Sequence, residues 1–79
     1  RHYGIFSNSR GRMNLNPHYL INLLEERGFI FKRAKGSHRL YYNPINNKTV
    51  IVPFHGGRDL KKGTFLAILK QAGIDKNSV

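Results

Sequence analysis

The sequence predicts an α+β domain in which a helix is followed by three antiparallel strands and a second helix. Apolar residues recur at the three-to-four spacing of a helix face near both ends of this domain. The stretch between them divides into three short runs of strand-forming residues, separated by turn residues. Because a chain of 79 residues has room for one compact core, both helices are expected on one face of a single small sheet.

The first helix is expected to begin at Pro17, because Asn16 can cap it and proline is favoured at the first helical position. Leu20 and Leu24 then lie on one helix face and indicate its buried side. Gly28 is the expected end, since glycine takes the left-handed conformation of a helix C-terminus at little cost.

Three runs rich in aromatic and β-branched residues predict strands over residues 29–34, 38–42 and 48–54. Pro53 indicates that the far end of the third strand is unpaired or at an edge. Strand alternation places Arg39 and Tyr41 on one face of the sheet, with Leu40 and Tyr42 on the other. Neither face is cleanly polar, so the face without helices is expected to meet solvent or a partner.

The second helix is expected to carry one buried stripe and to end at Gly73. The stripe consists of Phe65, Ile68, Leu69 and Ala72. Two starts are open, one capped by Asp59 and a later one capped by Thr64. Residues 75–79 are expected to fray.

Charge is the strongest compositional feature, with 14 basic against 4 acidic residues and a formal net charge of +10. Such a chain attracts polyanions, which makes nucleic acid the leading partner class. An anionic membrane surface is the rival, but it requires a basic amphipathic helix, and residues 17–27 carry two acids and one arginine. No apolar run approaches the roughly 18 residues of a membrane span, so no membrane partner is expected.

Cysteine is absent, which excludes disulfides, thiolate metal sites and a cysteine nucleophile. A reducing compartment, the cytoplasm, fits this composition. Histidine and carboxylate spacings typical of metal sites are also missing, and so is the P-loop spacing. We therefore expect no metal, no small-molecule cofactor and no nucleotide hydrolysis.

Residues 1–12 form a basic leader with three arginines and no acid, and Met13 follows it directly. We interpret this leader as foreign to a protein whose translation starts at Met13. The alternative is a disordered basic arm that touches nucleic acid. The single functional domain is therefore assigned to residues 13–79.

His38 and His55 are the candidate chemical groups, because each lies beside glycine at a strand end with cations nearby. Lys35, Gly36 and Ser37 can hold a phosphate while His38 takes a proton from a ribose 2′-hydroxyl. The alternative is an ordinary hairpin turn followed by an ordinary strand residue. His55 fits a general acid, a phosphate ligand or a plain loop residue equally well.

Lys61 and Lys62 stand at the entrance of the second helix, where backbone N–H groups and the helix dipole favour an anion. A solvated basic loop is the alternative. Together with the net charge, this pair predicts contact with phosphate.

The order of helices and strands resembles the double-stranded RNA-binding fold. Three blocks resemble the HicA family and occur in the right order: Gly36-Ser37-His38-Arg39, residues 50–56, and residues 59–64 with 68–73. Residues 23–29 also fit the family's first helix and strand, so the resemblance spans residues 15–74. HicA proteins are small bacterial toxins of toxin–antitoxin pairs and act as messenger-RNA interferases. The resemblance therefore implies a metal-independent endoribonuclease, with messenger RNA as substrate and a HicB-like antitoxin as partner.

The resemblance also implies that His38 is the catalytic histidine, acting as general base. Charge stabilisation and RNA contact are assigned to the glycine, the serine and the cations around it, namely Lys35, Gly36, Ser37, Arg39, Lys61 and Lys62. His55 is the possible second acid or base, provided that the fold brings it near His38. Two rivals remain: a non-catalytic RNA-binding module of the same fold, and an interaction protein whose charge complements an acidic partner.

Overall fold

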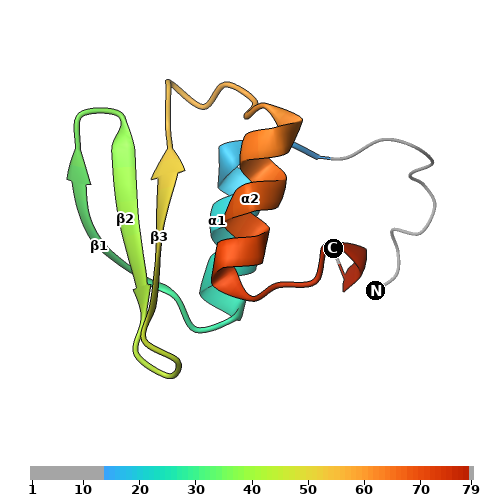
Figure 1. Cartoon of the computed structure of the whole chain (residues 1–79). Coiled ribbons are helices and arrows are strands. Elements are labelled where there is room, and N and C mark those ends of the chain that lie inside the picture. The colour runs from blue at the N-terminus through green and yellow to red at the C-terminus, as the bar shows by residue number, and fades with distance from the viewer. Residues whose placement is uncertain (1–13, 79) are drawn as a thin grey trace.

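The computed structural model describes residues 14–78 (Figure 1). Its elements are α1 (Pro17–Glu26), β1 (Ile30–Lys35), β2 (His38–Asn43), β3 (Lys48–Pro53), α2 (Lys62–Ala72) and a short 3-10 helix, η1 (Lys76–Ser78). The predicted α+β order of helix, three strands and helix is therefore confirmed. The basic leader expected over residues 1–12 lies outside the described residues.

The three strands form an antiparallel sheet in the order β1-β2-β3, so β3 is an edge strand. Both helices lie on the same side of this sheet, and α2 runs beside β3 (Figure 1). The two helices also begin at the same end of the molecule, because the N–H of Leu60 donates to the C=O of Leu15 over 2.8 Å. The turn between β1 and β2 lies at this end as well (Figure 1).

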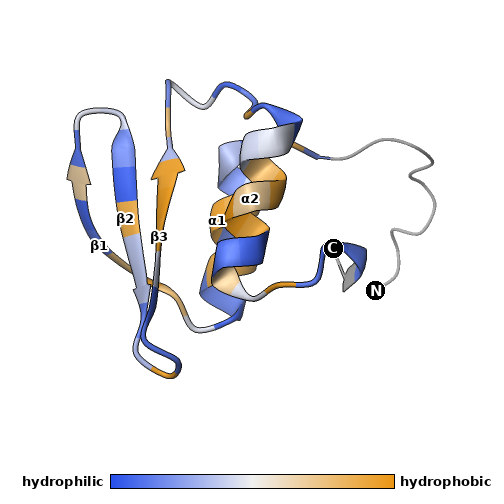
Figure 2. Cartoon of the chain, in the orientation of Figure 1, coloured by the Kyte–Doolittle hydropathy of each residue, from blue (hydrophilic) through white to orange (hydrophobic). Residues whose placement is uncertain are grey.

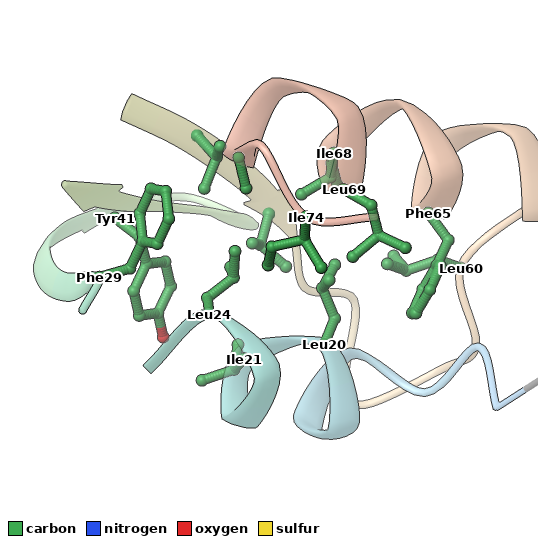
Figure 3. Close-up of a cluster of buried hydrophobic side chains, with 13 residues drawn as sticks. Leu20, Ile21, Leu24, Phe29, Tyr41, Leu60, Phe65, Ile68, Leu69 and Ile74 are labelled. Carbon is green, nitrogen blue, oxygen red and sulfur yellow. The ribbon is translucent and has the colours of Figure 1, made fainter. Parts of the chain in front are cut away.

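The core lies between the helices and the sheet (Figure 3). Its most deeply buried large side chains are those of Leu20, Leu24, Phe29, Val50, Val52, Phe65 and Leu69. Figure 2 shows a hydrophobic stretch in β3, and Val50 and Val52 of this strand are buried in the core. The predicted alternation is confirmed, since Tyr41 and Val50 pair on the buried face and Leu40 and Ile51 pair on the open one.

The start of α1 and the C-terminal ends of both helices follow the predicted chemistry. Asn16 caps α1, with its side-chain oxygen accepting a hydrogen bond from the N–H of His18 over 2.8 Å. Gly28 and Gly73 have φ of 98° and 76°, a left-handed conformation that glycine adopts without strain.

The start of α2 differs from both expected caps. The helix is capped by the backbone of Lys61, with no side-chain hydrogen bond, so neither Asp59 nor Thr64 caps it. The buried side chain of Leu60 and the hydrogen bond of its N–H to Leu15 hold the chain where the helix starts.

Two smaller differences concern β1 and the end of the chain. The first strand begins one residue later than expected and contains an irregularity between Phe31 and Arg33. Residues 76–78 form a 3-10 turn in place of the expected frayed end. The buried side chain of Ile74 holds this segment against the core, and its N–H donates to the C=O of Leu69 over 2.9 Å.

Asn43 is a buried polar residue that joins α1 to the turn after β2. Its side-chain nitrogen donates to the C=O of Arg27, and its side-chain oxygen accepts from the N–H of Ile45, each over 2.9 Å. Two elements that are distant in sequence are thus held together by one amide.

Replacing Asn43 by Ala is expected to lower the free energy of unfolding by about 2 kcal/mol, because it removes two hydrogen bonds from a buried position. Urea denaturation measures this change. The matched control is Asn22→Ala, which removes an exposed amide and should change the free energy by less than about 0.5 kcal/mol. Equal effects of the two substitutions would contradict the proposed linkage.

Tyr41 is buried beneath the sheet, with its ring against that of Phe31 at a centroid distance of 5.6 Å. Burial raises the pKa of its hydroxyl above the ordinary value, and a hydrogen bond with Arg39 partly opposes this shift. The folded chain therefore holds the phenolic proton at pH values where the unfolded chain loses it.

A raised phenol pKa makes the folded state less stable at high pH, because the unfolded state binds fewer protons there. The free energy of unfolding is expected to fall by up to about 1.4 kcal/mol per pH unit above pH about 10 through this group. Tyr41→Phe should abolish this component. Denaturation of both proteins from pH 8 to 11 gives the difference, and parallel curves would contradict the assignment.

Candidate active site

A cavity of about 590 Å³ opens where β2 begins, β3 ends and α2 begins. It is lined by His38, Pro53, His55, Arg58, Asp59, Leu60, Lys61 and Thr64. Both candidate histidines and one candidate lysine therefore line one cavity, although they come from three separate segments of the chain.

His38 reaches this cavity because it is the first residue of β2. It pairs with Pro53 on β3 and with Lys35 on β1, which places all three residues at the same level of the sheet. Arg39 and the buried Tyr41 lie on the helix side of the sheet, so strand alternation puts His38 on the open face, where its side chain is exposed. The sheet therefore presents His38 to solvent from a rigid backbone.

His55 reaches the same cavity through a loop that is held at both ends. Before it, the N–H of Phe54 donates to the C=O of Ser37 over 2.6 Å, which continues the pairing of β2 and β3 by one residue. After it, the N–H of Arg58 donates to the C=O of His55 over 3.1 Å and closes a turn. The position of His55 is thus tied to the start of β2.

The turn after His55 requires two glycines. Gly56 and Gly57 have φ of 62° and 82°, which a residue with a Cβ atom rarely adopts. The C=O of Gly57 accepts a hydrogen bond from the side chain of Asn16 over 3.4 Å, so the loop is also joined to the start of α1.

The Phe54 ring holds the loop from the helix side of the sheet. The guanidinium carbon of Arg39 lies 3.9 Å from the centre of this ring, and the His18 ring meets it edge-on at 5.0 Å. Such a cation–π contact contributes about 0.5–1 kcal/mol. Arg39 therefore lies on the face opposite His38, although the two are neighbours in sequence.

The remaining predicted residues do not line the cavity. Lys35, Gly36 and Ser37 form the β1–β2 turn and its approach, and Lys62 is the first residue of α2. Arg58 and Asp59 line the cavity but were not singled out as site residues from the sequence. No spacing rule marks them, because only the folded loop carries them to the histidines.

Net positive charge is greater at one end of the molecule than at the other. The end with the cavity and both helix N-termini carries Lys35, Arg58, Lys61 and Lys62. The opposite end, where the helices finish, carries three of the chain's 4 acidic residues, Glu25, Glu26 and Asp75, and these offset most of the charge of its cations, Arg27, Lys48, Lys70 and Lys76. Helix N-termini also favour anions, so the cationic side chains and the two helix dipoles both attract an anion to the cavity.

Two further features concern ligand classes. Across residues 14–78, no three histidine, aspartate or glutamate side chains gather in a way that holds a metal ion. In the same part of the chain, no helix has the length and hydrophobicity that crossing a membrane requires.

Comparison with known proteins identifies the family. No curated protein matches this chain. The family model described as the HicA toxin of bacterial toxin–antitoxin systems matches residues 19–74. This match contains the whole sheet, α2 and every residue that lines the cavity. The chain therefore belongs to the HicA family, the toxins of bacterial toxin–antitoxin pairs.

Proposed function

We propose that this toxin is a metal-independent endoribonuclease that cleaves messenger RNA with His38 as general base. The family assignment supports an endoribonuclease toxin in general. The observation that carries the finer proposal is the meeting of His38, His55 and Lys61 in one cavity. Two imidazoles and a cation around one phosphate supply what RNA cleavage needs.

In the proposed reaction, His38 takes the proton of a ribose 2′-hydroxyl, and the 2′-oxygen attacks the adjacent phosphorus. The bond from phosphorus to the 5′-oxygen of the next nucleotide then breaks. His55 gives a proton to this leaving oxygen. The products are a 2′,3′-cyclic phosphate and a 5′-hydroxyl, and the nucleophile is part of the substrate itself.

Cations of the cavity stabilise the additional negative charge on phosphorus. Lys61 caps α2, so its ammonium and the helix N-terminus act on the same region. We assign RNA backbone contacts next to the cavity to Lys35, Gly36, Ser37 and Lys62. Arg39, on the far face, acts in this proposal by holding the Phe54 ring and with it the loop of His55.

The partner that inhibits the toxin is, in this proposal, a HicB-like antitoxin. An antitoxin is implied by the family. The excess of cations around the cavity supports an antitoxin with an acidic surface that covers this end and excludes RNA from the cavity.

The test is cleavage of messenger RNA in the presence of EDTA. His38→Ala and His55→Ala should each lower the rate by at least about 100-fold, because each removes one proton transfer. The wild-type rate should fall on both the acidic and the alkaline side of its optimum, and each variant should lose one side. Lys70→Ala, an exposed lysine on the last turn of α2, is the control and should keep the wild-type rate.

All variants are compared under conditions in which they are equally folded, as measured by their denaturation curves, so that loss of folding is not mistaken for loss of catalysis. Equal cleavage by wild type and His38→Ala would reject His38 as the base. RNA binding without cleavage in EDTA would instead favour the non-catalytic RNA-binding module.

A further inference from the structure

A second cavity, of about 490 Å³, adjoins the first one along the unpaired edge of β3. The two cavities share Pro53 and Thr64 in their walls. The second is lined by Thr49, Ile51, Pro53, Thr64, Ala67, Ile68 and Gln71. An RNA strand whose phosphate lies between the histidines would therefore have a neighbouring nucleotide at this cavity.

Regular secondary structure builds the walls of this cavity. Thr49, Ile51 and Pro53 alternate along the edge strand β3 and so lie on its open face. The other lining residues come from α2, which runs beside this edge strand, and they form a stripe in which Thr64, Ala67 or Ile68, and Gln71 follow the three-to-four spacing of a helix face. The cavity therefore has two rigid walls.

Its chemistry differs from that of the first cavity. No charged side chain lines it, whereas histidine, arginine, lysine and aspartate line the first. Ile51 is 52% exposed, which leaves an apolar surface open to a ligand. Gln71 adds an amide that can both donate and accept a hydrogen bond, and two threonines add hydroxyls.

A nucleobase matches this lining. Its faces pack on apolar side chains, and its edge presents donors and acceptors of the kind that glutamine and threonine bind. A base in a duplex is stacked between its neighbours, so only an unpaired base can turn into such a cavity.

We propose that the second cavity binds the base of a nucleotide next to the cleaved bond, and that the toxin therefore acts on single-stranded RNA with a base preference at that position. This inference rests on the proposed ribonuclease function. Gln71 is the residue that reads the edge of the base, and Ile51 and Ala67 contact its faces.

The experiment measures binding of short single-stranded RNA oligonucleotides to the His38→Ala chain, in which cleavage is suppressed. An abasic nucleotide is placed at each position of the oligonucleotide in turn to find the position at which removing the base weakens binding. Each of the four bases is then tested at that position. Adding Gln71→Ala should weaken binding of the preferred base about ten-fold and leave the abasic oligonucleotide unaffected. Ala67→Leu, which fills the cavity, should weaken binding of all four bases at that position.

Asn22→Ala is the matched control, since it removes an exposed amide from α1, outside both cavities. Equal base discrimination with and without Gln71→Ala and Ala67→Leu would overturn the proposal. So would loss of antitoxin binding in these variants with RNA binding unchanged, because the cavity would then hold a protein segment added to the edge of β3.

Cleavage by the same variants with His38 restored separates this proposal from the proposed function. A chain that discriminates bases through Gln71 but never cuts would keep the base site and reject the ribonuclease. A chain that cuts with the same base preference in Gln71→Ala and Ala67→Leu would keep the ribonuclease and reject the base site.

Discussion

The hydrogen bond from the N–H of Phe54 to the C=O of Ser37 extends the pairing of β2 and β3 beyond Pro53, and the site depends on this extension. The register of the two strands places His38 opposite Pro53. The additional bond then starts the loop of His55 from a fixed point. Side-chain contacts of Phe54 with Arg39 and His18 reinforce the same point from the helix side. Two histidines 17 positions apart in the printed sequence thus line one cavity.

The arrangement of the helices contributes to a positive electrostatic potential at this cavity. Because α1 and α2 begin at the same end, their positive dipole ends and the neighbouring lysines act together. Asp59 is the one acidic residue that lines the cavity, and it is outnumbered there by Arg58 and Lys61, with Lys35 and Lys62 nearby. A polyanion is therefore drawn to the end of the molecule that carries the chemical groups, which joins the recognition of RNA to its proposed cleavage.

Most of the fold was predictable because it follows from local chemistry. The Asn16 cap, the glycines at both helix ends and the alternation along β2 and β3 each express a rule that acts within a few residues. The start of α2 was not predictable, because a contact between Leu60 and Leu15 fixes it. The same limit applies to the site. Neighbouring residues in the sequence mark His38 and Lys61, whereas the place of Arg58 and Asp59 in the first cavity, and the second cavity itself, depend on the packing of β3 and α2.

The most direct test of the account is the chemical nature of the ends that cleavage leaves. If His38 activates a ribose 2′-hydroxyl, mass spectrometry of the products in EDTA will find a 2′,3′-cyclic phosphate on one fragment and a 5′-hydroxyl on the other. A 3′-hydroxyl paired with a 5′-phosphate would contradict the account, because it would show that water and not the substrate's own hydroxyl attacks the phosphorus.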